Sequence, residues 1–287
     1  KTYRKNLYHL MGKKVRTIVI AAAGVGSRFS PLAPILPKEM FPIIDKPVIQ
    51  YVIEEANVSG INEIIIVINK NKQILVDYLL KNDSFRKTLK NTSIKFVHQE
   101  GQHYGDAIPI ISAEKFLKKE PFLVLWADSF SLPKFERIKN LIRIYDKYQK
   151  SVVSFIPISV EQTAYSAAVP RIKRVNGNLI TFDRIFKNPG PIHAPALLTA
   201  PSGFILEPEI FLHLHKLEPN KQGEYCLINA IDSYCKKHLT YGLIFKKPFF
   251  EAGNPKDLIK TIIKIPFYRD DLKDIAKEIK SINITNL

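Results

Sequence analysis

The chain has 287 residues, and its content of 46% hydrophobic and 24% charged residues is ordinary for a globular protein. This composition excludes a disordered tail, a collagen-like repeat and a disulfide-stapled miniprotein, and no apolar run is long enough to span a membrane. The 43 Lys and Arg against 27 Asp and Glu give a formal net charge of +16, which suits anionic ligands such as nucleotides or sugar phosphates. Because the basic residues are scattered, a solvated lysine-rich surface explains most of this charge.

In its first half, the chain alternates apolar strands with amphipathic helices. We expect strands at 15–22, 63–68, 94–97 and 121–126, separated by helices at 47–59, 72–80 and 107–116. Runs such as EIIIVI, apolar at nearly every position, are typical of strands buried on both faces of a parallel sheet. The alternation predicts an α/β fold with a Rossmann-like, doubly wound sheet.

The second half continues the alternation of strands and helices, except for one predicted hairpin. We expect a helix at 134–148, a strand at 151–157, a hairpin at 167–183 around Asn176-Gly177, a loop at 187–203, a strand at 202–206, a helix at 224–237, a strand at 239–245 and a helix at 255–263. The hairpin predicts a small β lobe inserted into the sheet domain. We therefore divide the chain into a basic N-terminal extension, 1–14, and a single domain, 15–287.

The stretch AAAGVGSRFSPLAPILPKEMFPI, residues 21–43, carries the strongest chemical signal. Gly24 and Gly26 directly follow a buried strand, where glycine lets backbone N–H groups approach a phosphate closely. Arg28 adds a guanidinium suited to phosphate oxygens. Lys38 lies ten residues beyond Arg28, on a proline-stiffened loop from which it can reach the same phosphate chain. The pattern is neither a complete GxGxxG fingerprint nor a GxxxxGK[ST] P-loop.

The number and spacing of the cysteines indicate whether the protein works in an oxidising or a reducing compartment. Cys226 and Cys235 are the only two, and they form no CxxC pattern. Neither a zinc site nor a disulfide framework is indicated, so we expect a reducing cytoplasm.

Three blocks, GVGSR, PKEMFP and DKPVIQYVIEE, fall within residues 24–55. They resemble the signature of the sugar-1-phosphate nucleotidyltransferase family, and most closely the bacterial UTP–glucose-1-phosphate uridylyltransferases. A weaker similarity continues to about residue 263. The resemblance implies the nucleotide-diphospho-sugar transferase type of mixed sheet. It also implies a reaction in which a sugar-1-phosphate oxygen attacks the α-phosphorus of UTP and pyrophosphate leaves.

The resemblance assigns the nucleotide side of the site to the first half of the chain. Arg28 and Lys38 would act as catalytic cations that balance charge on the departing pyrophosphate. Gln99 would pair with the uracil edge, although a plain surface amide is an equally good interpretation. The nucleotide-binding set that the resemblance implies is Ala22, Ala23, Gly24, Gly26, Gln99 and Gly105.

A Mg²⁺ ion is implied by the same resemblance. Asp128 follows the strand PFLVLW and would hold the metal together with phosphate oxygens; the alternative for Asp128 is a helix N-cap. Glu251 stands where the family usually has aspartate, and it would be a second metal ligand.

The sugar side of the site departs from the family pattern. Lys187 would grip the sugar phosphate and Glu224 the sugar hydroxyls, against the alternatives of a solvated lysine and an ordinary glutamate in the first turn of a helix. Four positions differ from the pattern: Phe186 replaces an acidic residue, Ser166 and its neighbours replace a glycine-rich segment, Asn229 replaces a common aspartate, and Ser27 replaces threonine. A different sugar or nucleotide, weak activity or a non-catalytic nucleotide-binding paralogue therefore stay open.

Two further classes of protein are weaker alternatives. A nucleic-acid binder is suggested only by the net charge, because no basic and aromatic module accompanies it. A hydride-transfer Rossmann enzyme lacks the third glycine and the expected acidic residue. We expect UTP and a sugar-1-phosphate as partners, a homo-oligomer, and neither a specific nucleic acid nor a membrane.

Overall fold

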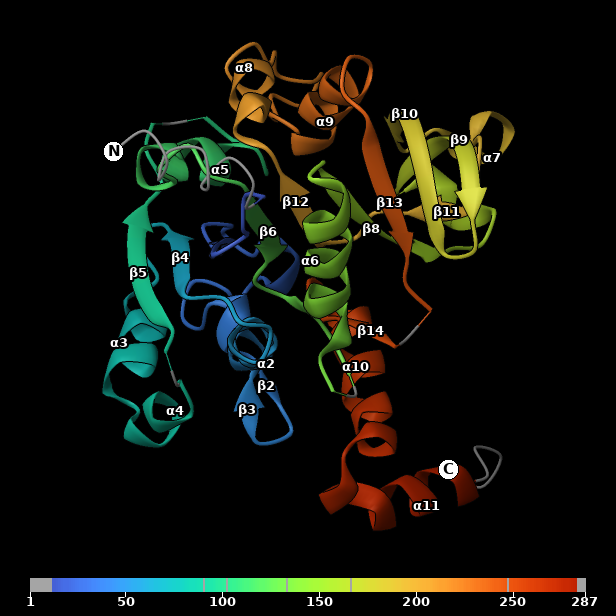
Figure 1. The fold of residues 1–287 in the computed structure, drawn as a ribbon. Helices are drawn as coiled ribbons and strands as arrows, with labels where there is room; N and C mark the ends of the chain where they lie inside the picture. The colour runs from blue at the N-terminus through green and yellow to red at the C-terminus, as the bar shows by residue number, and fades with distance from the viewer. Residues whose placement is uncertain are drawn as a thin grey trace.

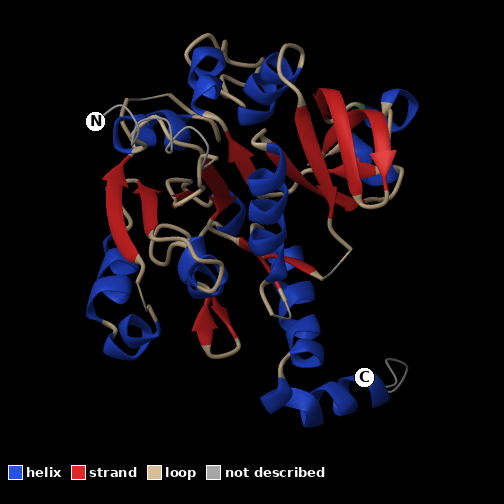
Figure 2. Ribbon diagram, viewed as in Figure 1, coloured by secondary structure: helices blue, strands red, loops and turns tan. Residues whose placement is uncertain are grey.

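The structure, a computed structural model, describes residues 12–89, 91–101, 103–132, 134–165, 167–246 and 248–282. Most of the predicted N-terminal extension, and Ser166, lie outside these residues. Figures 1 and 2 show a central sheet with helices packed around it, and a C-terminal helical segment that extends from one end. No helix within the described ranges is long and apolar enough to cross a membrane.

The central sheet is mixed and ten-stranded, with the order β5-β4-β1-β6-β12-β8-β13-β10-β9 and with β11 paired to β8. Strands β1, β4, β5 and β6 are mutually parallel, whereas β12 runs antiparallel between β6 and β8. The strands are β1 (Thr17–Ala21), β4 (Glu63–Ile68), β5 (Ser93–His98), β6 (Phe122–Trp126), β8 (Val152–Pro157), β9 (Ala168–Asn176), β10 (Leu179–Lys187), β11 (Leu198–Thr199), β12 (Phe204–Leu206) and β13 (Thr240–Ile244).

Two small strand pairs flank the sheet. They are β2 (Pro42–Ile43) with β3 (Lys46–Pro47), and β7 (Ser129–Ser131) with β14 (Phe249–Glu251). The α-helices are α2 (Val48–Asn57), α3 (Gln73–Lys81), α4 (Asp83–Thr88), α5 (Ile108–Ala113), α6 (Glu136–Tyr148), α7 (Gly190–His193), α8 (Phe211–Leu214), α9 (Leu227–Cys235), α10 (Pro255–Lys264) and α11 (Lys273–Ser281).

Alternation along the central strands builds a core on each face of the sheet. In β4, Ile64 and Ile66 join one apolar cluster with α2 and α6, while Ile65 and Val67 join the other cluster with α5 and α9. Successive side chains of a strand point to opposite faces, so a strand covered on both sides must be apolar throughout. This arrangement confirms the predicted α/β class and the mixed doubly wound sheet.

Several element boundaries differ from the expectations. The predicted helix at 224–237 begins only at Leu227, so Glu224 precedes the helix and is not a residue of its first turn. The predicted loop at 187–203 contains α7 and β11. The pair β7–β14 was not anticipated, because strands of three residues are too short to show periodicity.

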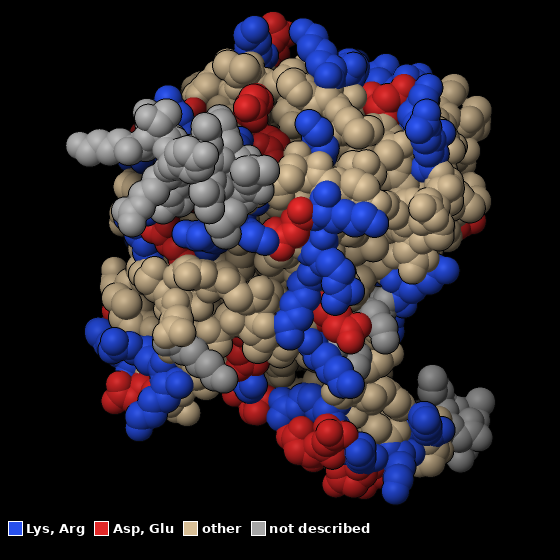
Figure 3. All heavy atoms as spheres, in the orientation of Figure 1, with Lys and Arg blue, Asp and Glu red and all other residues tan. Residues whose placement is uncertain are grey.

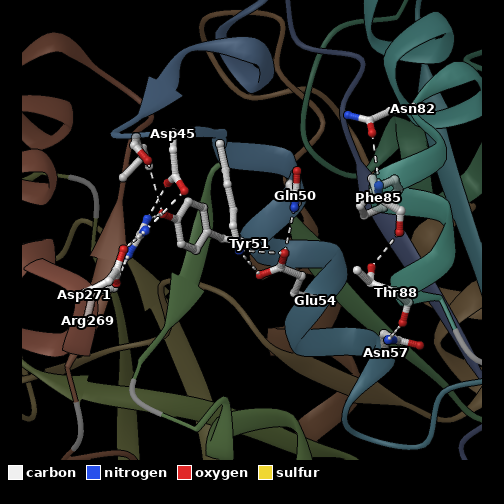
Figure 4. A network of polar contacts seen from close by, with 12 residues as sticks. Asp45, Gln50, Tyr51, Glu54, Asn57, Asn82, Phe85, Thr88, Arg269 and Asp271 are labelled. Atoms are coloured by element: carbon white, nitrogen blue, oxygen red, sulfur yellow. Dashed lines mark hydrogen bonds and ion pairs between the residues drawn. The ribbon is translucent and has the colours of Figure 1, made fainter.

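The C-terminal segment is tied to the β2–β3 hairpin through one arginine. Arg269 donates hydrogen bonds to Asp45, with one contact of 3.1 Å from Nη2 to Oδ2, and to the Tyr51 hydroxyl at 3.2 Å. It also contacts Asp271, at 2.5 Å from Nη2 to Oδ2. Figure 4 shows this contact beside the Gln50–Glu54 hydrogen bond of α2. The hydrogen bonds that Arg269 donates to Asp271 and Asp45 raise the pKa of Arg269. Residues more than 200 positions apart therefore form one charged cluster.

Basic side chains are spread over the surface, with a denser row along α6 (Figure 3). Lys139, Arg143 and Lys147 are exposed there at four-residue spacing, which places them on one face of the helix. Acidic side chains are interspersed, and Lys14 pairs with Asp146 at 2.9 Å.

Candidate active site

The glycine loop lies at the carboxyl ends of β1, β4 and β6. The Ala22 amide donates to the Val67 carbonyl at 2.8 Å, and Asn69 Nδ2 donates to the Ala23 carbonyl at 2.6 Å. Gly26 has a φ of 72°, in the left-handed region that glycine adopts without strain. These contacts fix the backbone of the loop at the edge where doubly wound sheets bind their ligands.

Lys38 runs alongside this loop. A Cβ placed on Gly24 would lie 3.9 Å from Lys38 Cε, and one on Gly26 would lie 3.7 Å from Lys38 Cβ. The Lys38 ammonium is hydrogen-bonded to Asp128, and both side chains are mostly shielded from solvent. Burial favours loss of the Lys38 proton, but the Asp128 and Glu39 carboxylates outweigh this effect and raise the pKa of Lys38. The lysine is therefore held in its cationic form.

Arg28 lies near enough to Lys38 and Glu251 to influence both electrostatically. It belongs to a short 3₁₀-helix, Ser27–Phe29, that starts directly after Gly26, and it is exposed. Its guanidinium acts electrostatically on two groups, opposing the charge of Lys38 and favouring the ionised form of Glu251. The structure thus brings Arg28, Lys38 and the glycine loop together around one location.

A second carboxylate, Glu251, lies close enough to Asp128 to interact with it electrostatically. The β7–β14 pairing places Glu251 opposite Ser129, and the Ala252 amide donates to the Asp128 carbonyl at 2.9 Å. Asp128 leads into β7, so the helix N-cap alternative is wrong. Glu251 keeps solvent access, yet desolvation by surrounding protein atoms and the nearby Asp128 charge raise its pKa to about 7.

This pair suits a hard divalent cation that takes its remaining ligands from phosphate and water. Desolvation and the Asp128 charge both disfavour the ionised form of Glu251, and a bound cation would favour it. Among the described residues, no group of three or more His, Cys, Asp and Glu could hold a metal by itself.

A second buried pair, not singled out from the sequence, lies behind Lys38. Glu39 is fully buried and accepts a hydrogen bond of 2.5 Å from Lys72 Nζ, which is itself buried. Burial raises the pKa of Glu39 despite this contact, and its Oε1 atom has no hydrogen-bond partner. The sequence block PKEMFP already places Glu39 next to Lys38. The partner of Glu39, Lys72, is 33 positions away and could not be predicted from the sequence.

The two predicted sugar-side residues are in direct contact. Lys187, at the end of β10, donates to Glu224 Oε2 at 2.8 Å and to Cys226 Sγ at 2.9 Å. Burial works against the Lys187 charge, but the Cys226 and Glu224 contacts prevail and raise the pKa of Lys187. Burial likewise opposes the Glu224 charge, yet Lys187 lowers the pKa of Glu224 overall. Cys226 was considered from the sequence only as a zinc or disulfide candidate.

Gly105 lies where two backbone segments meet. A Cβ on Gly105 would lie 2.2 Å from the Tyr225 carbonyl oxygen, and its φ is 135°. Asp106 Oδ1 accepts a hydrogen bond of 2.6 Å from the Leu227 amide at the start of α9. Gly105 thus adjoins the sugar-side segment. Gln99 follows β5, where its backbone N–H donates to the Ile68 carbonyl at 2.8 Å.

Two of the positions that depart from the family pattern, Phe186 and Asn229, line a cavity with Lys187 at the end of β10. The Phe186 ring packs under the Arg184 guanidinium, 4.8 Å from ring centroid to Cζ. Asn188 Oδ1 accepts from the Ala167 amide at 2.8 Å. A cavity of about 470 Å³ is lined by Phe186, Lys187 and Asn229 among others. A larger one, of about 600 Å³, lies between Tyr145, Glu207 and Tyr234, away from Lys38 and Lys187.

A doubly wound mixed sheet with a glycine loop, two cations and two carboxylates at its edge defines an α/β enzyme that handles nucleoside phosphates. The chain matches the nucleotidyl transferase family over residues 17–266, and it belongs to that family. The resemblance predicted from residues 24–55 is therefore confirmed.

Individual relatives extend this match over nearly the whole chain. UTP–glucose-1-phosphate uridylyltransferase 2 of Streptococcus pyogenes serotype M3 is 34% identical over 91% of this chain and 94% of its own. The corresponding uridylyltransferase of Streptococcus pneumoniae serotype 4 is 32% identical over 92% of this chain and 96% of its own. A crystal structure of UDP-glucose pyrophosphorylase complexed with UDP-glucose superposes with a TM-score of 0.82 at 28% identity, covering 89% of this chain and 100% of that one.

Proposed function

We propose that this chain makes UDP-glucose and pyrophosphate from UTP and glucose-1-phosphate. The observation that carries the proposal is the Lys38–Asp128 contact beside Gly24 and Gly26, which joins a cation and a carboxylate at a loop shaped for a phosphate. The family membership and the uridylyltransferase relatives support the same reaction.

In the proposed reaction, an oxygen of the sugar phosphate forms a bond to the α-phosphorus of UTP. The bond from the α-phosphorus to the oxygen that bridges it to the β-phosphorus breaks, and pyrophosphate leaves with that electron pair. Such transfers need positioning and charge neutralisation more than covalent help from the protein. Backbone groups of Ala22, Ala23, Gly24 and Gly26 hold the nucleotide, and Arg28 and Lys38 stabilise the charge that develops on pyrophosphate.

We assign Asp128 and Glu251 as the protein ligands of a Mg²⁺ ion. When bound, this ion would neutralise triphosphate charge and act as a Lewis acid on the phosphate groups. Lys38 contacts Asp128 in the structure, so the ammonium already occupies the place of a counter-cation and would shift toward the phosphates as substrate binds. Gln99 and Gly105 complete the proposed nucleotide side.

On the acceptor side, Lys187 holds the sugar phosphate and Glu224 bonds sugar hydroxyls. We also propose a homo-oligomer in the cytoplasm. A nucleoside triphosphate substrate and two unpaired cysteines, Cys226 and Cys235, suit that reducing compartment.

The test is pyrophosphate release in a screen of UTP, dTTP and CTP against several sugar-1-phosphates in the presence of Mg²⁺. We expect UTP with glucose-1-phosphate to turn over fastest, and Lys38→Ala to lower kcat by about 10²- to 10³-fold because it removes a charge that acts on the leaving group. Lys46→Ala is the matched control, since Lys46 pairs with Glu54 outside the site.

Faster turnover of another pair would reassign the substrate. Binding of UTP without turnover of any sugar phosphate would indicate a nucleotide-binding paralogue. Equal rates for wild type and Lys38→Ala would overturn the assignment of the catalytic cation.

A further inference from the structure

Cys226 forms a closed set of contacts with the two sugar-side residues. Its sulfur accepts from Lys187 Nζ at 2.9 Å and lies 3.3 Å from Glu224 Oε2. Asn220 Nδ2 reaches the same carboxylate oxygen at 3.2 Å and the sulfur at 3.6 Å. Cys226 is the last residue before α9, which packs along β10 (Figure 1). The thiol therefore joins the end of β10 to the start of α9 through the Lys187 ammonium.

The environment of Cys226 makes the sulfur a neutral acceptor. The residue is completely buried, and this burial raises the pKa of its thiol although Lys187 opposes the shift. An ammonium has three N–H donors. Lys187 donates one N–H to Glu224 and another to Cys226. These two contacts fix the direction of its third N–H. A thiol can direct the ammonium in this way without cancelling its charge, which a third carboxylate beside Glu224 and Asp106 would do.

We propose that Cys226 is a positioning residue for the acceptor substrate, holding Lys187 so that its remaining donor meets the phosphate of the sugar-1-phosphate. This inference rests on the proposed function, because it takes Lys187 as the residue that grips that phosphate. Cys226 does not touch the reacting atoms and acts only through Lys187.

The test is steady-state kinetics of wild type, Cys226→Ala, Cys226→Ser and Lys187→Ala, with the two substrates varied separately. We expect Cys226→Ala to raise KM for glucose-1-phosphate about five- to tenfold, the effect of losing one hydrogen bond of ordinary net strength, because sulfur is a weak acceptor. KM for UTP should not change. Cys226→Ser should restore most of the loss, because its hydroxyl oxygen also accepts from Lys187.

Cys235→Ala is the matched control. Cys235 is the other buried cysteine and lies on the same helix, but its sulfur contacts only the Asp232 carbonyl at 3.4 Å among the hydrogen bonds of the described residues. This variant should leave both KM values unchanged, which separates positioning from a general loss of packing.

Three results would overturn the proposal. They are an unchanged KM for glucose-1-phosphate in Cys226→Ala, an equal rise in KM for UTP, and a Cys226→Ser variant as impaired as Cys226→Ala. Lys187→Ala separates the role proposed for Lys187 from the role proposed for Cys226. If it leaves KM for glucose-1-phosphate unchanged, the role proposed for Lys187 is wrong and the role of Cys226 falls with it. If it raises that KM while Cys226→Ala does not, only the inference about Cys226 fails.

Discussion

The nucleotide side and the sugar side of the site are built in different ways. The nucleotide side uses one continuous stretch, from the glycine loop to Lys38, at the ends of central strands, and adds Asp128 and Glu251 from the adjoining β7–β14 pair. The sugar side joins the end of β10 to the segment before α9, through the partly exposed Lys187–Glu224 ion pair.

The contacts that hold the nucleotide-side residues and the sugar-side residues in place also differ. Behind Asp128, the fully buried Glu55 and Arg137 side chains hold β7 in place. On the sugar side, the supporting contacts join the end of β10 to the segment before α9, and the Lys187 and Glu224 side chains keep partial access to solvent although Cys226 is buried. The stretch that is recognisable as a sequence motif is therefore supported by buried core contacts, while the part proposed to bind the acceptor depends on a partly exposed ion pair, which contributes less to stability.

The largest expected effect comes from breaking the buried support. Glu55 accepts from Arg137 at 3.0 and 2.9 Å and from the Ser131 amide and hydroxyl at 3.1 and 2.8 Å. Glu55→Gln leaves a buried guanidinium without a counter-charge, which should lower the free energy of unfolding by about 3–5 kcal/mol. Urea denaturation measures this change.

The matched control for that change lies in the β9–β10 hairpin. Asp183 pairs with Arg171 at 2.8 and 3.0 Å on the surface. Asp183→Asn should cost no more than about 1 kcal/mol. Equal losses of unfolding free energy in Glu55→Gln and Asp183→Asn would contradict the contrast between buried support on the nucleotide side and exposed ion pairs on the sugar side.

An intermediate effect is expected at Gly105, where the added Cβ would meet the Tyr225 backbone at 2.2 Å. Gly105→Ala should destabilise the fold by about 1–3 kcal/mol beyond the cost at Gly60→Ala, because neither backbone segment can yield easily. Gly60 also has a positive φ, of 82°, but nothing lies within 4 Å of its Cβ position, so it isolates the cost of the backbone conformation.

Kinetics of the same variant would refine the boundary between the two halves. We expect Gly105→Ala to raise KM for UTP, because Gly105 belongs to the proposed nucleotide side, and to raise KM for glucose-1-phosphate as well, because the added Cβ displaces Tyr225 and with it Glu224. A rise in KM for glucose-1-phosphate alone would instead place Gly105 in the sugar half.

The smallest expected effect is a pH dependence of stability in the metal-free protein. The pKa of Glu251 is raised from 4.5 to about 7, so the folded state binds this proton more tightly than the unfolded state. The resulting stabilisation is fully present below pH 4.5 and is lost as pH rises through about 7. It should be small, because Glu251 keeps solvent access.

Urea midpoints measured between pH 4.5 and 8 with a chelator present would test this dependence. The Glu251→Gln variant should lack the part of the pH slope that Glu251 supplies. Identical slopes in the two proteins would show that the Glu251 carboxyl titrates at its ordinary pH.

Much of the fold could be predicted because the central strands are apolar on both faces. The period-two alternation that normally marks a strand is replaced there by continuous runs such as EIIIVI, which only a sheet covered on both sides explains. The short pairs β2–β3 and β7–β14 could not be predicted, since two or three residues show no period. That limitation mattered at the site, because the β7–β14 register is what places Glu251 beside Asp128.

The sequence by itself determined the family, the doubly wound class and the glycine loop with Arg28 and Lys38, because those features are local patterns of residue type and spacing. Only the tertiary structure decided that Lys38 contacts Asp128, that Lys72 contacts Glu39, and that Cys226 contacts Lys187. Each of these contacts joins residues 33 to 90 positions apart. No local pattern encodes such a pairing, because it depends on how the strands are ordered and how the segments between them cross the edge of the sheet.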